Sequence, residues 1–112
     1  MEIVFRTTKL QKEFSSSKSL VQNYGAKRAA RLMQRITELR AAVSLEELRD
    51  LPAAHCHQLG QNRLGQIAVN LDQPFRLIVK PTHSPIPVKS DGGLDWSQVT
   101  SIEILEVVNY HE

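Results

Sequence analysis

The chain contains 112 residues, of which 41% are hydrophobic and 23% are charged, a composition that fits one globular domain spanning residues 1–112. No stretch approaches the roughly 20 apolar residues of a membrane span, and the first residues lack the basic-then-apolar layout of a secretory signal. Because Cys56 is the single cysteine, an internal disulfide is excluded and we expect a cytoplasmic protein with no membrane partner.

The net charge of +2 is unevenly distributed along the chain. Residues 1–49 contain ten Lys and Arg against five Asp and Glu, whereas residues 50–112 contain four against seven. A basic region can bind a polyanion. It can equally be the solvated face of a helix, so charge alone does not choose between these interpretations.

The first half of the chain predicts one strand followed by helices. Residues 2–7 alternate in polarity, which is typical of a short strand. A short helical segment over 9–14 should follow, and then a helix over 17–24 that begins after a serine cap and ends at Gly25.

The strongest helical pattern runs from Ala26 to about Val43. Apolar residues recur there at spacings of three and four and form one stripe that includes Val43, while the Lys and Arg residues, Arg35 among them, fill the other faces. We expect this helix to pack against the one before it as a hairpin.

From residue 55 the polarity period changes to two, which predicts strands. A strand over 55–59 precedes a β-hairpin formed by 66–71 and 75–80, and residues 81–93 form a loop. The last strand, over 99–108, is apolar on both faces and suits the sheet interior, with Ile102 and Ile104 on one face and Leu105 and Val107 on the other. The order β-α-α-β-β-β predicts an α+β fold with a mostly antiparallel sheet.

Strand alternation places Arg76 and Lys80 on the same side of the hairpin. Phe75 and its apolar neighbours should pack under the helices, and Arg76 should lie opposite Asn70. The side away from the helices is then polar and cationic, and a guanidinium there can bind phosphate in a fork. A surface arginine on a solvated sheet is the alternative.

His55, Cys56 and His57 are consecutive, which suggests a metal site. Alternation directs Cys56 away from the two histidines, and no further cysteine lies at a zinc-ligand spacing. We therefore expect neither a metal nor a cofactor.

The C-terminal pair Tyr110 and His111 completes a set with His57 and Arg76. Metal-independent cleavage of RNA needs a base for the 2′-hydroxyl, cations for the charged phosphate and an acid for the leaving oxygen. Histidine serves as base or acid near neutral pH, arginine supplies charge, and tyrosine can stack on an unpaired base. The assignment of acid and base stays open.

Four segments of the chain resemble the HigB branch of the RelE/ParE toxin superfamily, in its longer plasmid maintenance killer members. The resemblance covers nearly the whole chain and agrees with a RelE-like element order. The segments are His57–Gln66, Pro74–Ile78, Asp91–Ser97 and Val108–His111.

This resemblance implies the toxin of a type II toxin–antitoxin pair. Such toxins are endoribonucleases that cut mRNA in the ribosomal A site during translation, without a cofactor, and so inhibit translation. The implied partners are the ribosome, mRNA and an antitoxin with a helix-turn-helix domain, whose complex with the toxin binds operator DNA.

Matched to the family residue by residue, His57, Arg76, Tyr110 and His111 correspond to the catalytic set. Arg63 corresponds to a basic turn residue that contacts RNA.

The chain departs from the family at Gly60, where lysine is common, and at Asn109, where aspartate is common. Lys80 shares a strand face with Arg76 and can replace the missing cation. The expected RNA-binding residues are therefore Arg63, Lys80 and Asn109.

Two other functions remain open. A gyrase-poisoning toxin of the ParE type shares the fold but does not need the terminal Tyr110–His111 pair. A degenerate toxin would only bind its antitoxin and operator DNA, and the departures at Gly60 and Asn109 are compatible with it.

Overall fold

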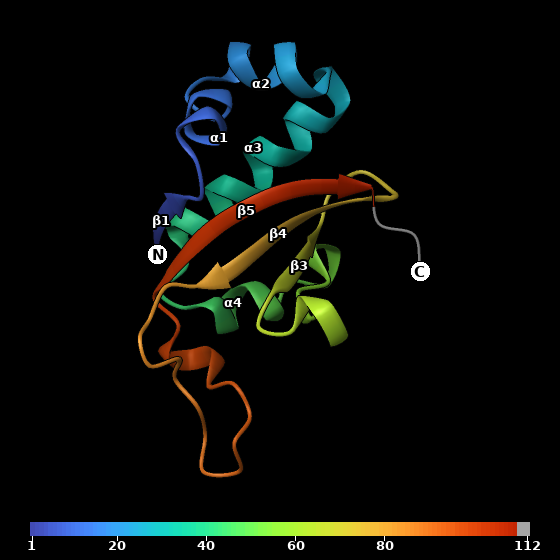
Figure 1. Ribbon diagram of the computed structural model, residues 1–112. Coiled ribbons are helices and arrows are strands. Elements are labelled where there is room, and N and C mark those ends of the chain that lie inside the picture. The colour runs from blue at the N-terminus through green and yellow to red at the C-terminus, as the bar shows by residue number, and fades with distance from the viewer. Residues whose placement is uncertain (110–112) are drawn as a thin grey trace.

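The computed structural model describes residues 1–109 as a five-stranded sheet with helices packed on one side (Figure 1). The strands lie in the order β1-β5-β4-β3-β2. Their bounds are β1 Glu2–Phe5, β2 His57–Gln58, β3 Ile67–Asn70, β4 Phe75–Pro81 and β5 Ser101–Asn109. The helices are α1 Thr8–Glu13, α2 Ser17–Tyr24, α3 Ala26–Ala41 and α4 Leu45–Arg49. Within the described residues the β1–β5 pairing is parallel and the other three are antiparallel, which confirms the expected α+β fold with a mostly antiparallel sheet.

Local capping explains where the first three helices begin and end. The side chains of Thr7 and Ser16 accept backbone N–H groups at the starts of α1 and α2, as expected of N-cap residues. Gly25 separates α2 from α3 with φ of 82°, a conformation that other residues rarely adopt.

The apolar stripe of α3 packs on the sheet as predicted, with Leu32 and Leu39 fully buried. The helix ends at Ala41, however, and Val43 is 74% exposed, so its inclusion in the stripe was wrong. Arg35, which the sequence placed outside the apolar stripe, is buried as well, with its side chain only 2% exposed.

Arg35 is buried because three fixed acceptors satisfy its guanidinium. Nε donates to the Asn70 carbonyl oxygen at 2.7 Å, Nη2 to the Ala53 carbonyl oxygen at 3.0 Å, and Nη1 to Glu38 at 2.8 Å. A buried charge is tolerated only when it is paired in this way. The side chain therefore links α3 to the end of β3 and to the turn that leads into β2.

A β-bulge in β5 corrects the predicted alternation of the last strand. Ile78 pairs with Glu106 but Val79 pairs with Ile104, which leaves Leu105 as the extra residue. One extra residue reverses the alternation beyond it. Val107 consequently packs in the core under the helices with Ile104, whereas the sequence had placed it on the opposite face.

The β3–β4 hairpin follows the prediction, with Asn70 opposite Arg76. The strand expected over 55–59 is shorter, because residues 52–54 form a 3₁₀ turn and His55 has φ of 40°. The segment between β4 and β5 projects away from the sheet (Figure 1). No helix among residues 1–109 is both long and apolar enough to cross a bilayer.

Candidate functional site

The side of the sheet away from α3, called the open face below, carries most of the candidate residues. A row of paired residues crosses it from His57 on β2 through Ala68 and Ile78 to Glu106 on β5. Leu59, Ala68, Ile78 and Leu105 form a small buried cluster there, with Val108 packed against it. The open face is therefore apolar in the middle with polar groups around it, and not polar throughout as expected.

His57 and Arg76 meet on this face. The Arg76 Nη1 atom lies 3.4 Å from His57 Nε2, and His57 Nδ1 lies 2.7 Å from the carbonyl oxygen of His55. A carbonyl oxygen only accepts and a guanidinium only donates. These contacts therefore fit a neutral imidazole with its proton on Nδ1 and its lone pair on Nε2, facing Arg76.

His55 has a role that the sequence did not indicate. Its backbone adopts φ of 40°, which aims the carbonyl oxygen at His57 Nδ1. Its ring centroid lies 4.6 Å from that of His57. His55 thus orients His57. Within residues 1–109 no three His, Cys, Asp or Glu side chains are grouped so that they could hold a metal ion.

Arg63 belongs to a 3₁₀ turn, Gln61–Arg63, and reaches β5 across the open face. Its Nη1 donates to Gln66 at 2.9 Å and to Glu106 at 3.1 Å. Both acceptors engage the same nitrogen. Within residues 1–109 no partner of Nε or Nη2 is seen, so this edge of the guanidinium can make a bidentate contact with an anion.

Lys80 also pairs with a carboxylate of β5, since its Nζ lies 3.5 Å from Glu103. Lys80 and Arg76 are four positions apart along β4, so their Cα atoms lie about 13 Å apart. The idea that Lys80 supplies a cation beside Arg76 stays a prediction, and it requires Lys80 to leave Glu103. The two β5 glutamates that pair with the basic side chains, Glu103 and Glu106, were missed from sequence.

The other expected site residues are not brought to Arg76 by the described structure. Asn109 pairs with Phe75, whose ring packs toward the helix side of the sheet, so Asn109 is directed away from the open face. Tyr110 and His111 lie outside the described residues. Within the described part, the end of β5 does reach the site, because Val108 pairs with Arg76.

Cys56 is unsuited to nucleophilic chemistry. The side chain is 7% exposed. Burial raises the pKa of its thiol to about 12, although the nearby charge of Arg49 lowers it. The thiolate is the reactive form of cysteine, and at neutral pH this thiol stays protonated.

The fold is similar to that of a chain in the YoeB–YefM complex from Staphylococcus aureus. The TM-score is 0.54 at 14% sequence identity, and the match covers 100% of this chain and 98% of that chain. This likeness confirms the expected RelE-like fold. No protein-family model matches the chain, and no curated protein sequence matches it.

Proposed function

We propose that this chain is the toxin of a type II toxin–antitoxin pair and that it cleaves mRNA on the ribosome. The observation that carries the proposal is the 3.4 Å contact between Arg76 Nη1 and His57 Nε2 on the open face. The likeness of the fold to a chain of a toxin–antitoxin complex and the resemblance of the sequence to HigB support it.

In this mechanism His57 is the general base. When Arg76 turns from Nε2 to the bound phosphate, Nε2 takes the proton of the ribose 2′-hydroxyl, and the 2′-oxygen attacks the adjacent phosphorus. Arg76 stabilises the additional negative charge of the pentacovalent phosphate, which is the largest single contribution in many such sites. The bond from phosphorus to the 5′-oxygen then breaks.

The leaving 5′-oxygen needs a proton, and we assign this step to the Tyr110–His111 pair. The products are a 2′,3′-cyclic phosphate and a free 5′-hydroxyl. No metal takes part, because base, charge and acid all come from side chains.

RNA binding uses the basic residues around the apolar centre of the open face. Arg63 offers its Nε–Nη2 edge to a phosphate, and Lys80 contacts a more distant one after giving up Glu103. Asn109 contributes least, because it starts on the other side of the sheet. The proposed protein partner is an antitoxin with a helix-turn-helix domain, and the pair binds operator DNA through it.

The proposal is tested by inducing the chain briefly in bacteria and mapping the 5′ ends of mRNA. We expect growth arrest and new 5′ ends within translated frames for the wild type. Arg76→Ala should give neither, and Arg31→Ala should behave like the wild type, because Arg31 is exposed on α3 and bonded only to Gln34 among described residues.

Two results would reject the proposal. DNA-damage signalling with intact mRNA would indicate a gyrase poison. Normal growth with intact mRNA, from a chain that accumulates in folded form, would indicate a protein that only binds its partner.

A further inference from the structure

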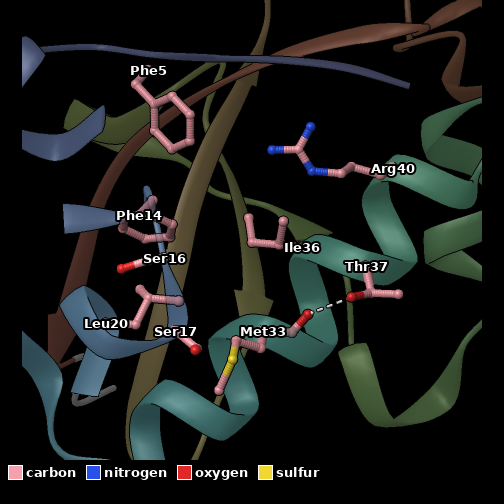
Figure 2. Close-up of a pocket in the computed structure, with 9 residues that line it drawn as sticks. All are labelled: Phe5, Phe14, Ser16, Ser17, Leu20, Met33, Ile36, Thr37 and Arg40. Atoms are coloured by element: carbon pink, nitrogen blue, oxygen red, sulfur yellow. Dashed lines mark hydrogen bonds between the residues drawn. The ribbon is translucent and has the colours of Figure 1, made fainter. Parts of the chain in front are cut away.

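An open groove of about 320 Å³ lies between β1, the α1–α2 connection and α3 (Figure 2). Its apolar floor consists of Phe5, Phe14, Leu20, Met33 and Ile36. All but Leu20 are only partly buried. Covering this surface would release the water in contact with it, which favours association.

One end of the groove carries an unneutralised positive charge. Arg40 is exposed, and in Figure 2 its side chain extends from α3 toward Phe5. No ion pair to its guanidinium is found within residues 1–109. All residues that line the groove come from residues 1–49, a range with ten Lys and Arg against five Asp and Glu. The charge complement of this end is a carboxylate, which a guanidinium binds in a fork.

Strand β1, at the edge of the sheet, borders the same groove. Among residues 1–109 it pairs with β5 alone, and the bonds from Glu2 N to Thr100 O and from Arg6 N to Ile104 O show that the backbone groups of its even-numbered residues face β5. The N–H and C=O groups of Ile3 and Phe5 alternate with these and point outward. An open strand edge can accept another strand.

Phe5 connects these two features. Its backbone groups lie on the open edge of β1, and its ring lines the groove. A strand added beside β1 would therefore direct every second side chain toward the groove and Arg40.

We propose that the β1 edge and the groove together bind an extended segment of a partner protein. The segment adds as a strand beside β1, with apolar side chains and one Asp or Glu on the face toward the groove. The partner is the one that the proposed function requires. The surface itself lies on the helix side of the sheet, so it can be tested without reference to RNA cleavage.

The probe is an acetylated, amidated peptide of sequence Thr-Leu-Thr-Val-Thr-Glu-Thr-Val, which presents Leu, Val, Glu and Val on one face. The matched control peptide has Lys in place of Glu. Amide hydrogen exchange should show fast exchange at Ile3 and Phe5 and slow exchange at Val4 in the free chain. The Glu peptide should slow exchange at Ile3 and Phe5 about tenfold or more, since edge amides then gain bonded partners.

A charge reversal tests the role of Arg40. Arg40→Glu should weaken binding of the Glu peptide about fivefold, as expected for a partly exposed ion pair, and should favour the Lys peptide. Arg31→Glu, on the exposed side of the same helix, should change neither affinity.

The proposal is overturned if the Glu peptide leaves exchange at Ile3 and Phe5 unchanged, or if both peptides bind both variants equally. It is also overturned if Ile3 and Phe5 are protected in the free chain and this protection falls on dilution, because a second copy then occupies the edge. Failure of RNA cleavage with successful peptide protection would reject the nuclease and leave this surface standing.

Discussion

The two sides of the sheet use arginine in opposite ways. On the helix side, Arg35 is buried with two of its three acceptors provided by backbone carbonyls, and Arg28 lies 3.2 Å over the Phe75 ring and 3.4 Å from Asp72. On the open face, Arg63 and Arg76 are half-buried and contact side chains of Gln66, Glu106 and His57.

We propose that this difference separates arginines that hold the fold from arginines that bind RNA. A carbonyl bonded to a buried guanidinium cannot be replaced by a ligand without unfolding the chain. A side-chain partner at a half-exposed site can turn away and give its place to a phosphate. We therefore expect changes on the helix side to lower stability, and changes on the open face to lower activity at nearly constant stability.

The largest effect should come from His57→Gln, which keeps a polar side chain but removes the base. Cleavage in a reconstituted translation reaction should slow by about a hundredfold or more, and the urea midpoint should change little. His55→Asn is the matched control, because asparagine tolerates positive φ and keeps the carbonyl that orients His57. A control variant as slow as His57→Gln would show that the His55 side chain takes part.

The next effect is on stability. Arg35→Met should lower the free energy of unfolding by about 3 kcal/mol, because Glu38 and two carbonyl oxygens lose their donor. Arg31 lies about one turn before Arg35 on the same helix but is exposed, so Arg31→Met should cost less than about 0.5 kcal/mol. Urea titration gives both values. If the folded fraction of Arg35→Met cleaves RNA tenfold more slowly than wild type, the division between the two sides is wrong.

Arg63→Ala should have a smaller effect, on RNA affinity. One lost phosphate contact should weaken binding about fivefold and reduce the slope of log affinity against log salt by about one. Lys89→Ala, in the segment between β4 and β5, should leave the slope unchanged. Equal slopes for wild type and Arg63→Ala would mean that Arg63 serves only to hold Glu106.

The smallest expected effect is a gain from Gly60→Lys. Gly60 has φ of −115° and a Cβ placed there meets nothing within 4 Å, so a side chain fits. The added cation stands at the start of the turn that carries Arg63, and should raise RNA affinity about twofold to fivefold. Gly60→Ala controls for the backbone. A gain of equal size in the alanine variant would assign the effect to rigidity and not to charge.

Alternation was sufficient to predict part of this arrangement. A strand period of two placed Arg76 opposite Asn70 and Phe75 under the helices, and the structure agrees. Strand alternation placed Val107, beyond Leu105, on the wrong face of β5, because it does not allow for the β-bulge. The bulge depends on how β5 pairs with β4, and no residue pattern in β5 predicts it.

The partners of the basic residues could not be predicted either. Arg63 and Glu106 are 43 positions apart, and their contact depends on how the β2–β3 turn folds over the sheet. The helical pattern placed Arg35 outside the apolar stripe, and nothing near it in sequence indicates that Asn70 and Ala53 present their carbonyl oxygens to it. Side-chain partners across the fold are set by tertiary packing.

The central claim is that His57 and Arg76 cleave mRNA on the ribosome, and the most direct measurement is of the ends that cleavage leaves. Purified chain is added to ribosomes translating a defined mRNA, and the fragments are analysed by mass spectrometry. We predict a 2′,3′-cyclic phosphate and a 5′-hydroxyl with wild type, and intact mRNA with Arg76→Ala. Intact mRNA with the folded wild type, or equal cleavage by Arg76→Ala, would contradict the account.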